Sequence, residues 1–361
     1  MAQERRRLDG RRARNAGRVL PRDWASRSRS SDEINALDLE GRDRQPSTIL
    51  RRVRGRVPRH DPFDQELVDG EGRDSVTVAG KLRRLMALPG AVIVPGAPNA
   101  LTARIAQEVG FKMVLFTGAG FANMELGVPD IGLTTLTEVV QQVGHMTDAL
   151  DIPVLVDADT GYGNALNVRR TVRELERAGA AGIILEDQMF PKRCGHFDGK
   201  EVITSEEMVA KIRAAVDARR DPETVIVART DARAVFGIED ACRRAAAYAG
   251  AGADVAFVEA PRTIDELAMI PRSSPVPQLV NMVEGGKTPV LPTRTLEEMG
   301  FKFVAYANSA LRAAIKGMQT VLSALGRDGS TDAVLDQMAS WEERQRLVGL
   351  PHYAELETRY S

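Results

Sequence analysis

The chain has 361 residues, of which 43% are hydrophobic and 27% are charged, so it is long and apolar enough to bury a sizeable core. Its formal net charge of −1 gives no reason to expect nucleic acid or a membrane as the main partner, and no apolar run approaches the roughly 18 residues that span a bilayer. Two cysteines are too few for a disulfide scaffold and fit a reducing cytoplasm, the location we expect.

The first part of the chain differs from the rest. Residues 1 to 75 hold 18 Arg, no Lys and 14 acidic residues, without sustained apolar periodicity. The acids interspersed among the arginines weaken an interpretation as a nucleic-acid-binding or targeting segment. We expect residues 1–76 to be a disordered tail, or sequence upstream of the true translation start, and residues 77–361 to be the catalytic domain.

After a short amphipathic helix at 81–87, apolar β-rich runs alternate with helical patterns. The runs are 91–97, 113–116, 153–156, 182–185, 224–232, 254–260, 277–286 and 301–309. Gly110 is placed to end the helix that follows the first run. A strand–helix alternation repeated eight times predicts a closed (β/α)8 TIM barrel, with an open doubly wound sheet as the alternative. The chain continues helical after residue 309.

Polar residues stand at the carboxyl ends of these runs, where parallel α/β folds place their chemistry. They are Thr117, Asp157, Asp159, Glu186, Asp187, Arg229, Asp231, Glu259, Asn281, Asn308 and Ser309. A single such residue could be a helix cap or a turn residue, but agreement among seven strands is hard to explain by capping alone. The pattern therefore predicts an enzyme with its site at this edge.

Three of these residues predict a metal site. Asp157, Asp159 and Glu186 are oxygen donors from neighbouring strands, and Mg²⁺ favours one or two direct carboxylates together with water and substrate. No matching histidines point to zinc. The alternative is that Asp157 and Asp159 only shape the DADTGYGN turn. We expect Mg²⁺, with Mn²⁺ as a possible substitute.

The loop after the fourth run carries Lys192, Arg193, Cys194 and His196. Nearby cations favour a thiolate, and such a thiol can donate or accept a proton near neutral pH. His196 is a candidate as the loop partner of Cys194. The other cysteine, Cys242, lies on the buried face of a predicted helix and is interpreted as a core residue.

Two further features concern anion recognition. Arg229 suits bidentate binding of a carboxylate, with an ion pair to Glu259 or Asp231 as the alternative. The backbone N–H groups of Gly118 and Ala119, in a glycine-rich turn after the second run, could cradle an oxyanion.

Four motifs resemble those of the isocitrate lyase and phosphoenolpyruvate mutase superfamily: VDADTGYGN, LEDQ followed by KRCGH, ARTDA, and NMVEGGKTP. The KRCGH loop is similar to that of the branch that cleaves isocitrate, 2-methylisocitrate and 2,3-dimethylmalate or other 2-alkylmalates. The resemblance spans residue 81 to the C-terminus. It implies a barrel with C-terminal helices swapped between subunits, and a homotetramer that is a dimer of dimers. The implied partner is a small-molecule carboxylate, with no nucleic acid and no membrane.

The resemblance also implies roles for individual residues. Asp157 and Asp159 would hold Mg²⁺, with Glu186 reaching it directly or through water. Cys194 would be the acid/base on a mobile loop. The α-keto product and the rest of the substrate would be held by Thr117, Gly118, Ala119, Asp130, Arg229, Glu259 and Asn281.

The implied reaction is Mg²⁺-dependent cleavage of a 2-hydroxy di- or tricarboxylate to an α-keto acid, such as pyruvate, plus a second carboxylate. Arg229, Lys192 and Arg193 would offset the charge of the leaving enolate, and Cys194 would protonate its carbon. Thr-Gly-Ala at 117–119 replaces the family's Ser-Gly-Gly, and Met-Val-Glu-Gly-Gly follows Asn281, which favours a smaller 2-alkylmalate. The alternatives are a carboxyphosphonoenolpyruvate phosphonomutase and a non-catalytic keto-acid-binding homologue.

Overall fold

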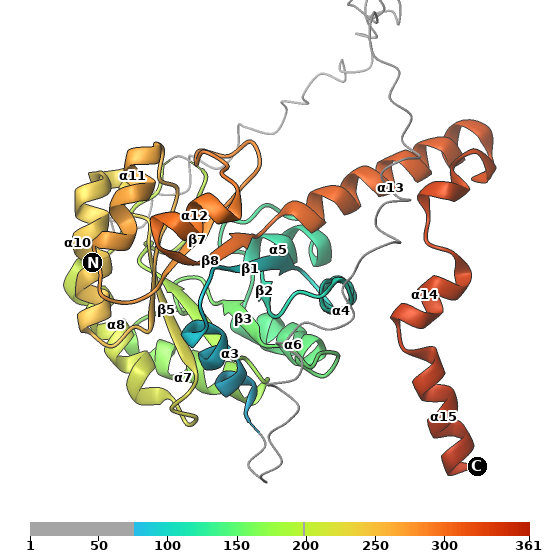
Figure 1. Ribbon diagram of the computed structural model, residues 1–361, viewed down its shortest axis with the longest axis horizontal. Helices are drawn as coiled ribbons and strands as arrows, with labels where there is room; N and C mark the ends of the chain where they lie inside the picture. The colour runs from blue at the N-terminus through green and yellow to red at the C-terminus, as the bar shows by residue number, and fades with distance from the viewer. Residues whose placement is uncertain (1–75, 198) are drawn as a thin grey trace, which may run out of the picture. The chain divides into compact units, whose positions relative to one another are not determined.

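The eight apolar runs form eight parallel strands in the computed structural model, which describes residues 76–197 and 199–361. The strands are β1 (Val92–Ala97), β2 (Val114–Phe116), β3 (Val154–Asp157), β4 (Gly182–Glu186), β5 (Val225–Thr230), β6 (Val255–Val258), β7 (Gln278–Asn281) and β8 (Phe301–Tyr306). Each strand pairs with the next, and β8 pairs with β1 (Figure 1). The sheet therefore closes, which confirms the predicted barrel over the open sheet. The disordered tail expected at residues 1–76 lies, apart from residue 76, outside the described residues.

Helices surround the barrel and continue beyond it. They are α3 (Val78–Ala87), α4 (Ala100–Val109), α5 (Gly118–Glu125), α6 (Leu136–Thr147), α7 (Ala165–Arg177), α8 (Ser205–Ala218), α9 (Arg233–Phe236), α10 (Ile238–Gly250), α11 (Ile264–Met269), η1 (Ile270–Arg272), α12 (Thr293–Met299), α13 (Ser309–Asp328), η2 (Asp332–Gln337), α14 (Trp341–Leu347) and α15 (Leu350–Tyr360). Gly110 ends α4 with a left-handed φ of 105°, as predicted.

Alternate strand residues fill the inside of the barrel. Val94, Leu155, Val227 and Phe303 belong to this core together with Leu82 of α3, which packs at the amino-terminal end of the strands. The other alternate residues pack against the surrounding helices. Each fully buried Leu or Phe contributes about 1.5–3 kcal/mol to folding. The apolar layers leave only the carboxyl edge of the barrel for polar side chains.

Helix α13 leaves the barrel after β8 and extends away from it, and α14 and α15 follow (Figure 1). An ion pair of 2.6 Å between Arg346 and Glu108 joins α14 to α4. Large apolar side chains along this extension stay exposed, including Leu322 at 63%, Trp341 at 65% and Tyr353 at 59%. Although α13 has 20 residues, neither it nor another described helix is both long and apolar enough to cross a membrane.

Candidate active site

Side-chain alternation decides which strand-end residues enter the barrel. Leu155, Ile184, Val227, Phe257 and Leu279 belong to the barrel core. A residue two positions further along a strand points to the same face. The next inward side chains are therefore Asp157, Glu186, Arg229, Glu259 and Asn281. These residues meet at one edge of the barrel.

Asp187 directly follows Glu186, so its side chain points to the opposite, outer face of the sheet. The prediction that it lies in the site is therefore wrong. Its carboxylate is buried and accepts hydrogen bonds from the hydroxyls of Thr230 (2.7 Å) and Tyr248 (2.8 Å) and from Arg244 Nη1 (3.2 Å). Asp187 therefore ties β4 and β5 to α10 on the outer face of the sheet.

Arg229 lies among carboxylates at the mouth of the barrel. Its guanidinium is 3.1 Å from Glu186 Oε2, 2.9 Å from Asp231 Oδ2 and 3.6 Å from Glu259 Oε2. Burial opposes the positive charge, but these carboxylates outweigh it and raise the pKa of Arg229. The ion pairs considered as the alternative for Arg229 are thus present, and they hold its guanidinium in a fixed direction.

Asp157 and Asp159 lie beside the start of α5. A Cβ placed on Gly118 would come within 3.2 Å of Asp157 Oδ2 and 3.4 Å of Asp159 Oδ1, so glycine permits this close approach. The Lys192 ammonium is 2.8 Å from Asp159 Oδ1 and also donates a hydrogen bond to Asp130. Burial opposes its charge, but the carboxylates, Asp159 first, raise the pKa of Lys192. A cation of the chain itself therefore contacts a predicted metal ligand.

The buried carboxylates fit a divalent cation. Glu186 Oε1 has no hydrogen-bond partner among the described residues, and burial raises the pKa of Glu186. Burial also raises the pKa of Asp159 to about 6, against the opposing effect of Lys192. In the described part of the chain, no three His, Cys, Asp or Glu side chains form a ready cation site. Mg²⁺ nevertheless needs only one or two direct carboxylates, because water and substrate complete its shell.

The Cys194 loop is closed at its base and lies against the mouth of the barrel. Gln188 pairs with Val202 in an antiparallel bridge, and its side chain bonds both the N–H and the carbonyl of Arg193. The Cys194 N–H donates to the carbonyl of Asp130 at 3.1 Å. These contacts fix both sides of the loop around the thiol.

Gly195 is pressed onto the site residues. A Cβ on Gly195 would lie 2.5 Å from Glu259 Cγ and 2.7 Å from Arg229 Nη2. We expect Gly195→Ala to hold the loop away from the mouth and to lower kcat by about 10²-fold, the effect of a misplacement near 1 Å. Steady-state kinetics would measure it, with Gly144→Ala as the control, because a Cβ there meets nothing within 4 Å. Wild-type turnover in Gly195→Ala would contradict this packing.

The structure corrects the expected protonation of Cys194. Burial raises the pKa of the thiol, and the carboxylate of Asp130 adds to the rise, so the expected thiolate is wrong. The loop cations do not reverse this effect, because Lys192 faces Asp130 and Asp159 while Arg193 is exposed. Cys194 therefore carries its proton at neutral pH and suits the role of proton donor.

Alkylation by iodoacetamide should reveal this protonation. In a Cys242→Ala background, the labelling rate of Cys194 should be slow at pH 7 and should still rise beyond pH 9, because only the thiolate reacts. Mass spectrometry after timed quenching would give the rate at each pH. A rate that reaches its plateau near pH 7 would contradict the raised pKa.

His196 joins the Cys194 loop to the segment after β7. Its Nδ1 accepts a hydrogen bond from the Lys287 N–H at 3.1 Å, so we assign the ring proton to Nε2, which lies 3.1 Å from Glu259 Oε1. Gly286 permits this contact, since a Cβ there would be 2.8 Å from Nδ1. Burial disfavours ionised Glu259, but Arg229 and His196 lower its pKa below its usual value. His196 is thus oriented by a carboxylate on one side and a backbone N–H on the other.

Thr117, Gly118 and Ala119 begin helix α5 and do not form the expected glycine-rich turn. Thr117 is the N-cap, and its Oγ1 accepts from the Gly120 N–H at 3.2 Å. The N–H groups of Gly118 and Ala119 have no acceptor within the helix, which leaves them for a carboxylate. Across the mouth, Asn281 Oδ1 is buried without a hydrogen-bond partner among the described residues.

Two residues near the site were missed in the sequence. Lys200 is buried, lies 2.7 Å from Asp231 Oδ1 and donates to the carbonyl of Gly195. Tyr162 has a buried hydroxyl without a hydrogen-bond partner in the described residues, and burial, with Asp159 next, raises its pKa. A signal existed for both, because Tyr162 lies within DADTGYGN and Lys200 follows the KRCGH loop.

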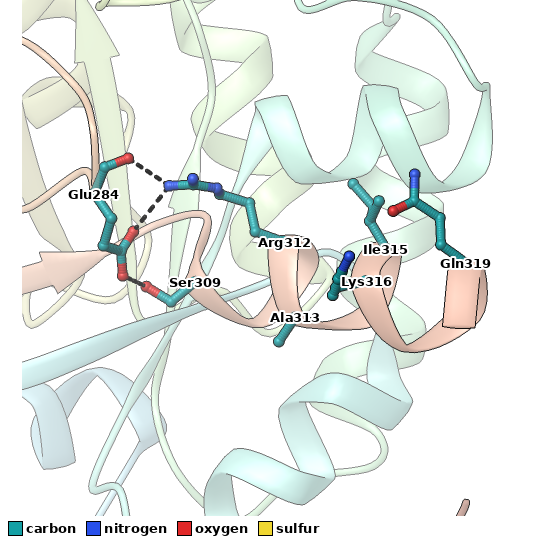
Figure 2. Close-up of a pocket in the computed structure, with 7 residues that line it drawn as sticks. All are labelled: Glu284, Ser309, Arg312, Ala313, Ile315, Lys316 and Gln319. Atoms are coloured by element: carbon teal, nitrogen blue, oxygen red, sulfur yellow. Dashed lines mark hydrogen bonds and ion pairs between the residues drawn. The ribbon is translucent and has the colours of Figure 1, made fainter. Parts of the chain in front are cut away.

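A hollow of about 580 Å³ lies apart from these residues, beside the first turns of α13 (Figure 2). Glu284 joins its wall to the segment after β7, because it accepts hydrogen bonds from the Ser309 hydroxyl and, through its carbonyl, from Arg312. The other lining residues also belong to α13 and are Ala313, Ile315, Lys316 and Gln319. The hollow contains neither the buried carboxylates nor Cys194, so it is distinct from the candidate active site.

Comparison with known proteins identifies relatives over the whole barrel. A family model described as phosphoenolpyruvate phosphomutase matches residues 82–325. A 2,3-dimethylmalate lyase of Eubacterium barkeri is 44% identical over 79% of this chain and 99% of its own length. A 2-methylisocitrate lyase of Aeropyrum pernix is 43% identical, over 78% of this chain and 90% of the relative. The chloroplastic carboxyvinyl-carboxyphosphonate phosphorylmutase of Arabidopsis thaliana is also 43% identical, over 84% and 89%.

Solved structures give the same result. A 2,3-dimethylmalate lyase crystal structure aligns with a TM-score of 0.75 and 34% identity over 79% of this chain and 96% of the other. A phosphonopyruvate hydrolase in complex with oxalate and Mg²⁺ aligns with a TM-score of 0.71 and 32% identity over 79% and 99%. These matches confirm the superfamily resemblance drawn from the motifs and the barrel predicted from the strand–helix alternation.

Proposed function

Because the chain belongs to the phosphoenolpyruvate phosphomutase family, we propose that it is a carbon–carbon lyase acting on a 2-hydroxy di- or tricarboxylate. The products would be an α-keto acid such as pyruvate and a second carboxylate. The observation that carries this proposal is the place of the Cys194 loop, which packs Gly195 against Arg229 and Glu259 at the mouth of the barrel. Among substrates, a 2-alkylmalate ranks before 2-methylisocitrate, in line with the 2,3-dimethylmalate lyase relative.

We propose that Mg²⁺, or Mn²⁺ in its place, is the cofactor. Asp157 and Asp159 would hold it, with Glu186 directly or through water, and the unpartnered Glu186 Oε1 supports this assignment. The ion would supply Lewis-acid polarisation of the substrate's hydroxyl and carboxylate oxygens.

The residues of the chain would divide the remaining work. The first-turn N–H groups of Gly118 and Ala119 would hold the carboxylate of the α-keto product. A carboxylate at the mouth would accept the proton of the substrate's hydroxyl. As the carbon–carbon bond breaks, the hydroxyl oxygen becomes the carbonyl oxygen, and the electron pair of the broken bond leaves with the second fragment as a carboxylate enolate. Arg229 would offset that charge, and the Cys194 thiol would give its proton to the enolate carbon. Gly195, packed against Arg229, would keep water from the enolate.

A carboxyphosphonoenolpyruvate phosphonomutase is the second candidate, since a carboxyvinyl-carboxyphosphonate phosphorylmutase is 43% identical to the chain. A non-catalytic keto-acid-binding homologue would not need a thiol, an arginine and three carboxylates, those of Asp157, Asp159 and Glu186, at one edge.

One assay separates these functions. Purified protein is supplied with Mg²⁺ and a panel of 2-alkylmalates, 2-methylisocitrate and isocitrate, and release of pyruvate or glyoxylate is followed by coupled reduction. We expect turnover on one member that stops on addition of EDTA. If folded protein turns over no member of the panel, the lyase is rejected. Turnover of carboxyphosphonoenolpyruvate would then establish the mutase.

We also propose a homotetramer, a dimer of dimers that exchanges its C-terminal helices, in the cytoplasm. The exposed Leu322, Trp341 and Tyr353 support the exchange, because a partner subunit would cover them. Both cysteines are free, as in a reducing compartment. Light scattering of the purified protein would test the assembly, and a monomer at micromolar concentration would contradict it.

A further inference from the structure

Lys200 connects the Cys194 loop to the barrel. Its ammonium lies 2.7 Å from Asp231 Oδ1, and both side chains are 0% exposed. The same ammonium donates to the carbonyl of Gly195, the residue directly after the cysteine. Neither the sequence motifs nor the proposed chemistry gives this lysine a role.

The other end of this connection is fixed. Asp231 follows β5, its N–H donates to Asp187 Oδ1 at 2.8 Å, and its carboxylate accepts from Arg229 Nε at 2.9 Å. Asp187 is itself held by α10 through Tyr248. A buried charge needs its partner, so Lys200 has no low-energy position away from Asp231. The Gly195 carbonyl is consequently bound to a donor that is itself held by the barrel through Asp231.

Gly195 is confined from its other side as well. Its Cα faces Glu259 and Arg229 so closely that an added Cβ would lie 2.5 Å from Glu259 Cγ. With the carbonyl bound to Lys200 and the Cα against the mouth, the peptide after Cys194 has little freedom. We infer that Lys200 is a positioning residue that sets the place of the Cys194 thiol through the carbonyl of Gly195.

Lys200→Met tests this inference, because methionine has a similar length and no donor. Alkylation of Cys194 by iodoacetamide should accelerate about tenfold, as expected for a loop released from its anchor. This arm needs no substrate. In the kinetic arm, which rests on the proposed function, kcat should fall by about 10²-fold while KM changes far less.

Lys302→Met is the matched control. Lys302 Nζ also donates to backbone carbonyls, those of Leu88 (2.5 Å) and Gly90 (2.7 Å), but at the amino-terminal end of the barrel. The Lys302→Met substitution should lower the melting temperature and leave both the labelling rate of Cys194 and kcat unchanged. Wild-type labelling in Lys200→Met, or equal acceleration in both variants, would overturn the inference. If labelling of Cys194 accelerates in Lys200→Met but neither the wild type nor any variant turns over a substrate, the proposed lyase function is rejected. The positioning role of Lys200 is then still supported.

A second comparison applies if Lys200→Met does not fold. The double variant Lys200→Met with Asp231→Asn removes both charges of the buried pair and leaves Asp231's backbone contacts intact. Lys302→Met again serves as the control. Labelling about tenfold faster in the double variant than in Lys302→Met supports the inference, and equal rates in these two variants overturn it.

Discussion

Replacing Cys194 with serine is expected to lower kcat by about 10²–10⁴-fold, the range that a positioned proton donor contributes. Serine keeps the size of the side chain and the backbone contact with Asp130, but its hydroxyl is a far weaker acid than a thiol. The enolate would therefore leave without an efficient donor. Mn²⁺ affinity should stay at the wild-type value, because the thiol is not among the proposed metal ligands. Steady-state kinetics and an Mn²⁺ titration followed by electron paramagnetic resonance would measure the two quantities.

The chain offers a control for this substitution. Cys242 lies on the buried face of α10, away from the mouth of the barrel, and Cys242→Ala should retain kcat. Equal turnover by Cys194→Ser and wild type would remove the thiol from the mechanism. A similar loss in both variants would instead indicate general damage to the fold.

Replacing Asp159 with asparagine should weaken Mn²⁺ binding by about 10²-fold and lower kcat/KM by about 10³-fold. The second figure corresponds to roughly 4 kcal/mol of lost charge stabilisation. Asparagine suits this test because the backbone of Asp159 has a φ of 49°, a left-handed conformation that asparagine tolerates. The variant should therefore fold while it loses the anionic oxygen.

Asp148→Asn, at the C-cap of α6, is the matched exchange and should change neither quantity. Unaltered Mn²⁺ binding in Asp159→Asn would reject this carboxylate as a ligand, whatever the activity. Retained binding with lost turnover would assign Asp159 to the substrate instead.

The barrel and the chemical character of its edge were predictable, and one further step was available. The runs ending in Asp157, Glu186 and Arg229 are buried on both faces, so their apolar pattern marks strands without marking the inward face. The alternation of side chains along a strand identifies the inward face once one inward residue is known. Glu186 lies two residues after Ile184 of the barrel core and points inward, whereas Asp187 lies three residues after it and points outward. Glu186 and Asp187 could thus have been separated once one inward residue was known.

The properties of the Cys194 loop could not be predicted in the same way. The charges of Lys192 and Arg193 are visible in the sequence, but their directions depend on tertiary contacts, and the Lys192 ammonium faces Asp159. Burial of the thiol also depends on the packed loop, and it reverses the expected shift of the pKa. Residues 118–120 begin a helix instead of the expected turn, and Thr117 caps that helix. Thr117 is a recognisable N-cap residue, but the small residues Gly118, Ala119 and Gly120 after it favoured the interpretation as a turn.

The contact of Lys192 with Asp130 and Asp159 has a consequence for how the protein is handled. The Lys192 ammonium acts as a counter-ion within the chain. It offsets the repulsion between these two carboxylates when a chelator removes divalent ions. If Mg²⁺ binds as proposed, the chain would still fold without the metal, and activity lost on chelation would return when Mg²⁺ is added back. The proposed metal site could then be loaded with Mn²⁺ or Co²⁺ for spectroscopy without refolding the protein.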